Sequence, residues 1–285
     1  MSLVVTGASG HLGRLTVQAL LDRGVPADTI VATARSIERL DDLAAVGVDV
    51  RPADYTDPQS LKEAFAGADR ILLVSSSEVG ARVDQHRNVV EAARDAGVDL
   101  LAYTSIPRAD TTALLLAADH AATERLVVDS GLPYVFLRNS WYLENYTAQL
   151  ATTLAHKAVL GSAGSGRVSA AVRADYAAAA AAVLTEDGPR RHAYELGGDT
   201  AFTLAEYAAT LSALVGEPIA YVDQAPADYE AFLESAGVPQ PMAHVLADSD
   251  VGIARGDLLV ESGDLRRLIG RPTVGLEDAL RAALA

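Results

Sequence analysis

The sequence predicts an α/β fold, in which a parallel sheet carries helices on both faces and a smaller C-terminal lobe follows. Two observations support this prediction. Short apolar runs alternate with amphipathic stretches through the first half of the chain, and this alternation weakens after residue 150. Near-continuous apolar strands are typical of a parallel sheet that is buried on both faces. Right-handed crossovers between such strands give a doubly wound arrangement.

Six strands are expected before residue 150, because six short apolar runs are separated by helical patterns. They lie at residues 2–7, 29–34, 48–54, 70–77, 99–105 and 133–139. The helices expected between them include residues 12–24, 57–69 and 83–97. We therefore expect residues 1–150 to form the first domain, with residues 168–200 returning to it.

Helical patterns dominate residues 151–285, which we expect to form the smaller lobe on the substrate side. Helices are predicted at residues 173–186, 204–216, 226–237 and 276–285, and residues 192–198 could return one more strand to the sheet. Thr203 and Glu206 have the spacing of a capping box at a helix start. Residues 247–256 (ADSDVGIARG) mix Asp and Gly without the spacing of a calcium loop, so we expect a capped turn there.

The composition excludes several classes of function. The 285 residues carry a net charge of −15, which argues against a nucleic-acid partner and against binding to an anionic membrane surface. The chain has no cysteine, so it has neither disulfides nor thiolate metal sites, and no metal site is predicted. We see no signal peptide and no apolar run long enough to cross a bilayer. These observations predict a cytoplasmic protein without membrane insertion.

The strongest motif is TGASGHLG, in which Gly7, Gly10 and Gly13 lie between the first strand and the first helix. Gly7 permits a tight turn, Gly10 lets the backbone approach a pyrophosphate, and Gly13 lets the helix pack closely on the strand. The phosphate charge then lies at the N-terminus of the helix. This context predicts a Rossmann-type, dinucleotide-binding domain.

Arg35 favours NADPH over NADH. An NAD site usually has a carboxylate at the end of the second strand, whereas this strand ends in Arg35 and the next carboxylate is Glu38. A guanidinium group can bind a 2′-phosphate through two parallel hydrogen bonds. Asp54 either bonds the adenine edge or caps a turn, and Arg173 either reaches a phosphate or closes a helix start. The small residues that follow the fourth strand would let a cofactor lie close: Ser75, Ser76 and Ser77.

The proton-donating pair of a typical short-chain dehydrogenase is missing. That pair is a Tyr followed four residues later by a Lys, which lowers the tyrosine pKa. The only lysines are Lys62 and Lys157, and neither follows any of the ten tyrosines at this spacing. This argues against carbonyl reduction and favours an acceptor that needs no strong acid. A quinone is such an acceptor, because its reduction depends mainly on positioning.

The segment LRNSWYLENY, from Leu137 to Tyr146, holds the only Trp of an aromatic-poor chain. A flat acceptor stacks on aromatic rings, so Trp141, Tyr142 and Tyr146 are predicted to surround the nicotinamide and its acceptor, with Asn139 on the cofactor. Alternatively, these rings only seal the two lobes. Further candidates for catalysis are two hydroxyls that end the fifth strand and a histidine that is either a weak proton donor or a hydrogen-bond anchor: Thr104, Ser105 and His120.

These residues resemble the NmrA-like branch of atypical short-chain dehydrogenases, and in particular bacterial NAD(P)H:quinone oxidoreductases of type 2, with triphenylmethane reductases as near relatives. The likeness covers almost the whole chain, and its most specific parts are residues 72–98 and the Trp-containing segment. It implies a Rossmann domain with a smaller lobe, the cofactor between them, NADPH-dependent quinone reduction without flavin, and a possible homodimer. The residues that it assigns to the cofactor are Gly7, Ala8, Ser9, Gly10, His11, Leu12, Arg35, Ser75, Ser76, Ser77, Asn139, Ser140, Trp141, Tyr142, Leu143 and Glu144.

Three functions remain open at this point. The first is an enzyme that passes hydride from NADPH to a quinone-like acceptor. The second is a redox sensor that binds NADP(H) and regulates a partner without turnover. The third is a reductase of cationic triarylmethane dyes, whose approach the negative net charge would favour. In many relatives of the isoflavone reductase type a lysine stands where this chain has His120, so their proton-donor mechanism does not transfer directly.

Overall fold

The computed structural model of the chain describes residues 1–78, 80–187 and 191–285. These residues form two compact units. The first comprises Met1–Ile106, Asp119–Arg138 and Arg173–Tyr194, and the second comprises Pro107–Ala118, Asn139–Val172 and Glu195–Ala285. Residue 79, and residues 188–190 within the predicted returning segment 168–200, lie outside the described residues.

The strands form a seven-stranded sheet in the order β3-β2-β1-β4-β5-β6-β8. The pairings between neighbours from β3 to β6 are parallel. This strand order reverses direction after β1, as in a doubly wound fold, so the predicted fold class is confirmed. The bounds of the strands are β1 (Leu3–Val5), β2 (Ile30–Ala34), β3 (Asp49–Pro52), β4 (Arg70–Leu73), β5 (Leu100–Ser105), β6 (Tyr134–Asn139) and β8 (Ala193–Leu196).

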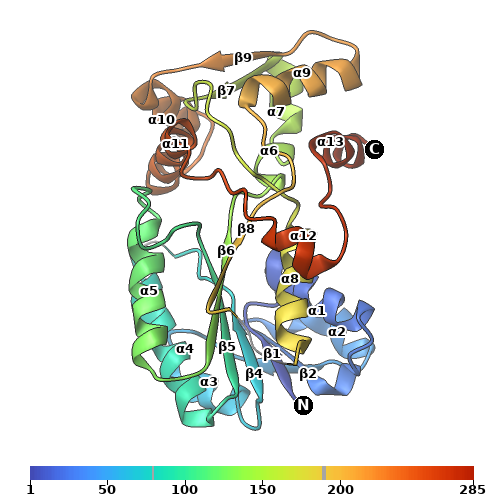
Figure 1. Cartoon of the computed structure of the whole chain (residues 1–285), viewed down its shortest axis with the longest axis vertical. Helices are drawn as coiled ribbons and strands as arrows, with labels where there is room; N and C mark the ends of the chain where they lie inside the picture. Colours follow the sequence, from blue (N-terminus) through green and yellow to red (C-terminus); the bar gives the residue numbers. More distant parts are fainter. Residues whose placement is uncertain (79, 188–190) are drawn as a thin grey trace. The chain divides into compact units, whose positions relative to one another are not determined.

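Helices cover both faces of this sheet (Figure 1). One face carries α3 (Pro58–Ala64), α4 (Arg82–Ala96) and α5 (Ala117–Asp129), and the other carries α1 (His11–Asp22) and α8 (Arg173–Thr185). The central strands β1, β2, β4 and β5 are buried along their whole length, which explains their apolar composition. Three short segments complete the connections near β2 and β3: η1 (Ala27–Thr29), η2 (Ile37–Leu40) and α2 (Asp41–Ala45).

The second unit is built mainly from helices around a two-stranded parallel sheet. The sheet pairs β7 (Ala158–Gly161) with β9 (Ala220–Asp223). Thr203 caps α9 (Leu204–Val215) and forms the predicted capping box with Glu206, because both reciprocal hydrogen bonds are present. The other helices are α6 (Glu144–Thr147), α7 (Leu150–His156), α10 (Pro226–Ser235), α11 (Gln240–Arg255), α12 (Asp264–Ile269) and α13 (Leu276–Leu284).

The predicted capped turn at residues 247–256 is wrong, because most of this segment belongs to α11. The helix begins after Pro239 and ends at Gly256, whose positive φ of 82° is typical of a residue that terminates a helix. Its buried positions include Ala243, Ala247 and Asp250, which recur with helical spacing. The Asp and Gly residues indicated a turn, but this buried face stabilises the helix through them. Among the described residues, no helix is long and apolar enough to cross a membrane.

Candidate functional site

The glycine loop of the first unit has the geometry that a pyrophosphate requires. Gly7 has a φ of 61°, which favours glycine, and a Cβ on Gly13 would lie 2.5 Å from the Gly7 carbonyl oxygen. The first turn of α1 begins at Gly10 with no side-chain cap and no acidic residue, and all of this turn lies within the described part of the chain. Its amide groups and the helix dipole therefore favour an anion. These residues fit the phosphates of a dinucleotide.

Arg35 lies at the carboxyl end of β2, where the sequence predicts the adenosine end of the cofactor. Its side chain is 70 % exposed and pairs with Glu78, at 3.1 Å between the guanidinium and carboxylate groups. Asp54 accepts hydrogen bonds from the amide and hydroxyl of Thr56, both at 2.8 Å, and these bonds lower its pKa. Asp54 therefore caps a turn in this structure. Arg173 is the first residue of α8.

The loop that follows β4 contains the three serines and is fixed by side chains of α4 and β5. The Ser75 amide donates to Thr104 Oγ1 and the Ser76 amide donates to His86 Nε2, both at 2.9 Å. Burial, reinforced by a neighbouring arginine, lowers the pKa of His86 to about 3. The ring is therefore neutral at pH 7, and its Nδ1 donates to Thr123 Oγ1 at 2.9 Å. Thr104 and His86 thus determine the conformation of the serine loop.

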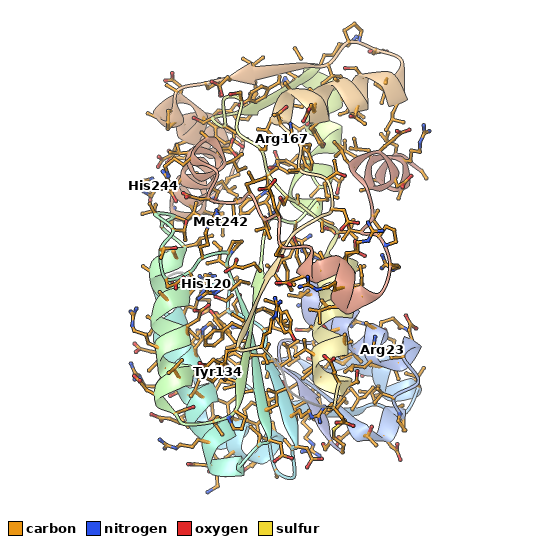
Figure 2. All side chains as sticks on the ribbon, viewed as in Figure 1. Arg23, His120, Tyr134, Arg167, Met242 and His244 are labelled. Carbon is orange, nitrogen blue, oxygen red and sulfur yellow. The ribbon has the colours of Figure 1, made fainter. Side chains whose placement is uncertain are left out.

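The other two candidates for catalysis in the first unit have buried partners. Ser105 Oγ donates to Glu124 at 2.6 Å, and Glu124 also pairs with Arg138 at 2.6 Å. His120 lies on the side of α5 that faces the sheet, with its Nδ1 2.7 Å from the hydroxyl of Tyr103 (Figure 2). Burial lowers the pKa of His120 well below its usual value, so its ring is neutral at pH 7. The catalytic roles of Ser105 and His120 stay predictions.

In the second unit, the aromatic segment leaves β6 with a fixed backbone. The Leu143 amide donates to the Ala171 carbonyl at 3.0 Å, and the Ala171 amide donates to the Trp141 carbonyl at 3.1 Å. Asn139 is buried and its Nδ2 lies 3.5 Å from the Tyr142 hydroxyl. The Asn139 Oδ1 has no hydrogen-bond partner among the described residues. A buried carbonyl oxygen without a donor fits a cofactor group with N–H or O–H donors.

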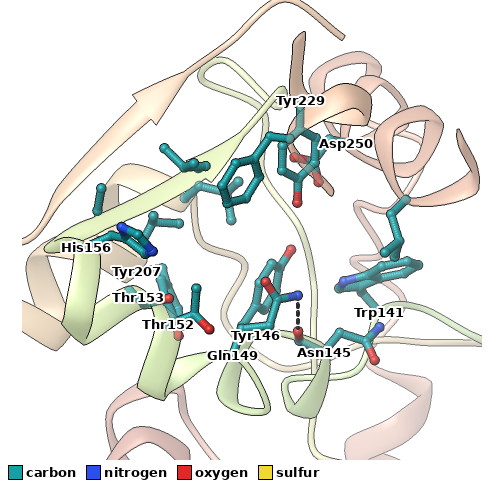
Figure 3. Close-up of a pocket in the computed structure, with 16 residues that line it drawn as sticks. Trp141, Asn145, Tyr146, Gln149, Thr152, Thr153, His156, Tyr207, Tyr229 and Asp250 are labelled. Carbon is teal, nitrogen blue, oxygen red and sulfur yellow. Dashed lines mark hydrogen bonds between the residues drawn. The ribbon is translucent and has the colours of Figure 1, made fainter. Parts of the chain in front are cut away.

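A pocket opens beside this segment, within the second unit. Figure 3 shows its side chains entering from several elements. Trp141, Asn145 and Tyr146 come from the predicted segment, whereas Tyr142 is not among the lining residues. The remaining lining residues are Gln149, Thr152, Thr153, His156, Ala158, Val159, Leu160, Leu204, Tyr207, Tyr229, Phe232, Leu246 and Asp250. The pocket is therefore aromatic, as a flat acceptor requires.

Burial favours the neutral forms of Asp250 and of two tyrosines of this pocket. Burial raises the pKa of Asp250 to about 7, although the Ser162 amide donates to its Oδ2 at 2.7 Å. Burial also raises the pKa of Tyr207 to about 12 and that of Tyr146 well above its ordinary value. The hydroxyl oxygens of Tyr146 and Tyr207 are buried without a hydrogen-bond partner among the described residues. Such hydroxyls can donate to an oxygen atom of a bound molecule.

Several residues of these sites were not predicted from the sequence. Glu78 and Asp250 lie 43 and 88 residues from the groups that they meet, and His86 lies 10 residues from Ser76, so no local motif marks them. Tyr207 and Tyr229 lie on helices that were predicted, and their aromatic side chains in an aromatic-poor chain were the one available signal. Among the described residues, no cluster of three or more His, Cys, Asp or Glu side chains could hold a metal ion.

Comparisons with known proteins agree with this architecture. Residues 7–187 match the family model described as NAD(P)H-binding. The chain is 46% identical to quinone oxidoreductase 2 of Escherichia coli over 278 residues, which cover 98% of this chain and 97% of that protein. These matches extend over both units.

Solved structures show the same full-length similarity. The crystal structure of NADPH-dependent quinone oxidoreductase QOR2 from Escherichia coli, complexed with NADPH, has a TM-score of 0.96 at 46% identity, covering 99% of this chain and all of that one. Triphenylmethane reductase from Citrobacter sp., complexed with NADP(H), has a TM-score of 0.93 at 38% identity, again covering 99% and 100%. The resemblance noted in the sequence is confirmed, and this chain belongs to the NAD(P)H-binding family, within the NmrA-like branch of atypical short-chain dehydrogenases.

Proposed function

We propose that this protein is an NADPH-dependent oxidoreductase that reduces a quinone or a similar flat, electron-poor acceptor without flavin. The observation that carries this proposal is the full-length similarity to NADPH-dependent quinone oxidoreductase, at 46% identity and a TM-score of 0.96. The aromatic pocket of the second unit supports it independently, because it suits a flat ring. In this proposal the first unit binds the phosphates of the cofactor, and the second unit binds the acceptor and adds Asn139 to the cofactor contacts.

The geometry of each unit supports the cofactor-binding roles proposed for its residues. The glycine loop and the uncapped start of α1 bind the pyrophosphate, and Arg35 binds the 2′-phosphate after leaving Glu78. The serine loop, held by Thr104 and His86, gives the cofactor a fixed surface. When bound, the reduced nicotinamide supplies a hydride. In the second unit, Asn139 offers its unpaired carbonyl oxygen to the cofactor.

The acceptor roles belong to the aromatic pocket. Trp141, Tyr146 and Tyr229 provide ring faces or edges against which a quinone stacks. Exclusion of water by these rings strengthens each hydrogen bond made to the acceptor oxygens. Tyr142 does not line the pocket, so we propose that it contacts the cofactor rather than the acceptor.

One alternative has a specific observation in its favour. The chain is 38% identical to a triphenylmethane reductase, and its net charge of −15 would attract cationic dyes over long distances. The relatives named above are described as an oxidoreductase and a reductase, which favours turnover over redox sensing. Cytoplasmic location, a homodimer and the lack of a nucleic-acid partner stay predictions.

A single assay tests the proposal. Purified protein is mixed with NADPH and a simple benzoquinone, and the loss of reduced-nicotinamide absorbance is followed against a protein-free control. We expect turnover that is faster with NADPH than with NADH. Turnover of triarylmethane dyes but not of quinones would identify the alternative reductase. Tight NADPH binding without turnover of quinones or dyes would contradict the proposal and favour a sensor.

A further inference from the structure

The lining of the aromatic pocket includes one carboxyl group. Asp250 lies on α11, is 6 % exposed and lines the pocket. Its Oδ2 accepts from the Ser162 amide at 2.7 Å, and a Cβ on Gly161 would lie 2.7 Å from the same oxygen. The glycine is therefore needed for the carboxyl group to approach this backbone. The backbone of Gly161 and Ser162 therefore fixes the position of this buried carboxyl group in the pocket wall.

The surroundings of Asp250 favour its protonated form. Among the described residues, no Lys, Arg or His side chain forms an ion pair with it. The titratable groups around it are tyrosines of α6, α9, α10 and β9, together with one further carboxylate, Asp223, and one histidine at the pocket wall, His156. Burial and, to a smaller extent, Asp223 raise the pKa of Asp250 to about 7. The carboxylic acid and the carboxylate of Asp250 therefore coexist at neutral pH, and the acid dominates below it.

Two hydroxyl groups lie near this carboxyl group. In Figure 3 the rings of Tyr146 and Tyr229 enter the pocket from opposite sides, with their hydroxyl ends turned toward each other and Asp250 beside Tyr229. The Tyr146 hydroxyl is buried and has no hydrogen-bond partner among the described residues. Since buried O–H groups nearly always have acceptors, an oxygen atom of a bound molecule can complete this arrangement. A quinone carbonyl supplies such an atom.

We propose that Asp250 is the general acid of the pocket, and that it protonates the acceptor oxygen while the Tyr146 hydroxyl orients that oxygen. This inference rests on the proposed function and adds a proton donor to it. The quinone gains a hydride, with its two electrons, and becomes a hydroquinone monoanion. The O–H bond of Asp250 then breaks, a new O–H bond forms on the anionic oxygen, and the carboxylate regains its proton from water.

The tyrosines cannot take this role themselves at neutral pH. Their pKa values are raised by burial, so they hold their protons more tightly than a free phenol. A group with a pKa near the working pH transfers a proton most efficiently. Tyr146 and Tyr229 therefore orient the acceptor or relay a proton. Asp250 is the carboxyl group of the pocket lining, and its protonation changes between pH 6 and pH 8.

The test compares Asp250→Asn with a matched control on the same helix. Asn keeps an oxygen that accepts from the Ser162 amide, so the fold is retained, and it cannot supply a proton. Asp248→Asn is the control, because Asp248 lies on α11 but does not line the pocket. With NADPH and duroquinone, Asp250→Asn should lower kcat on the order of 100-fold near pH 6, and the deficit should disappear near pH 9. Asp248→Asn should follow the wild type.

A binding measurement without cofactor supplies the second readout. Trp141 is the only Trp of the chain and lines the pocket, so saturable quenching of its fluorescence reports duroquinone binding. The wild-type Kd should rise about tenfold or more between pH 6 and pH 9, whereas Asp250→Asn should show a flat profile. Tyr146→Phe, which removes an unpaired hydroxyl, should weaken binding equally at all pH values.

The outcomes separate the two proposals. The wild type could oxidise NADPH with quinones and still have the same pH profiles of kcat and Kd as Asp250→Asn. This result would overturn the role of Asp250 and leave the proposed function standing. A wild type that turns over no quinone at any pH overturns the proposed function, whatever the fluorescence shows. If Asp250→Asn fails to fold, a pH-independent wild-type Kd alone is enough to overturn the inference.

Discussion

Arg35 and Glu78 form an ion pair that bears directly on cofactor choice. The two side chains are 70 % and 46 % exposed, so solvent weakens the attraction between them. Glu78 belongs to the loop after β4, so this carboxylate reaches Arg35 from a neighbouring strand rather than from the end of β2. A 2′-phosphate competes with Glu78 for the same guanidinium group, and Glu78 therefore opposes the preference for NADPH.

Substitutions of Arg35 and of Glu78 should shift the preference between NADPH and NADH in opposite directions. Arg35→Ala should raise the KM for NADPH on the order of tenfold, because a charge-assisted hydrogen bond contributes about 1.5–3 kcal/mol, and should change the KM for NADH little. Glu78→Gln should lower the KM for NADPH a few-fold, to about the extent of an exposed ion pair. Initial rates with both cofactors measure these effects. Equal changes for NADPH and NADH in Arg35→Ala would exclude a contact with the 2′-phosphate.

Trp141 should serve the acceptor more than the cofactor, since it lines the aromatic pocket. Trp141→Ala removes a stacking surface worth about 0.5–1.5 kcal/mol beyond its buried area, so the KM for quinone should rise roughly tenfold. The dissociation constant for NADPH should stay within about twofold of the wild type. A collapse of NADPH binding would instead identify Trp141 as part of the cofactor wall.

Asp250 also makes the stability of the protein depend on pH. Its pKa rises from 3.8 in a free chain to about 7 in the fold, so between these values the folded state binds the extra proton. Stability from this group is fully present below pH 3.8 and is lost as pH rises to about 7. Asp250→Asn removes this loss. The difference in free energy of unfolding between Asp250→Asn and the wild type should shift in favour of the variant by up to about 4 kcal/mol between pH 4 and pH 7. Above pH 7 this difference should stay constant. Urea unfolding at several pH values measures it.

At the level of elements, the close packing of α1 on the first loop depends on Gly13. A Cβ at this position would lie 2.5 Å from the Gly7 carbonyl oxygen and 2.9 Å from Ala8 Cα, both backbone atoms. Gly13→Ala should therefore move the helix start and destabilise the fold by about 1–3 kcal/mol. NADPH affinity should fall with it, because the amides that bind phosphate move. Gly24→Ala, where a Cβ meets nothing within 4 Å, distinguishes crowding from the strain of a positive φ.

Local sequence rules worked for elements whose ends are set by local interactions. The capping box of Thr203 and Glu206 involves four consecutive residues, so its hydrogen bonds could be predicted. α11 could not be predicted in the same way. Its Asp and Gly residues favour turns, but burial of Ala243, Ala247 and Asp250 stabilises a helix. Packing therefore outweighed local preference in this element.

For the whole molecule, binding of NADPH should appear as a gain in stability. A ligand that binds only the folded state stabilises it by about 2.7 kcal/mol when its concentration is 100 times Kd. We expect NADPH to raise the melting temperature more than NADH at equal concentration, and Arg35→Ala to remove this difference. Equal shifts for both cofactors in the wild type would contradict selection of the 2′-phosphate.

The parallel α/β fold could be predicted from the sequence, and so could the glycine loop, the position of Arg35 and the aromatic segment around Trp141. Each of these depends on periodicity or on residues that are close along the chain. Three features became visible in the folded chain: Glu78 meets Arg35, His86 and Thr104 hold the serine loop, and Asp250 lies among tyrosines in the pocket. The partners in these contacts lie between 10 and 88 residues apart along the chain, so no short motif joins them. A pKa such as that of Asp250 depends on burial, which arises only when the chain is packed.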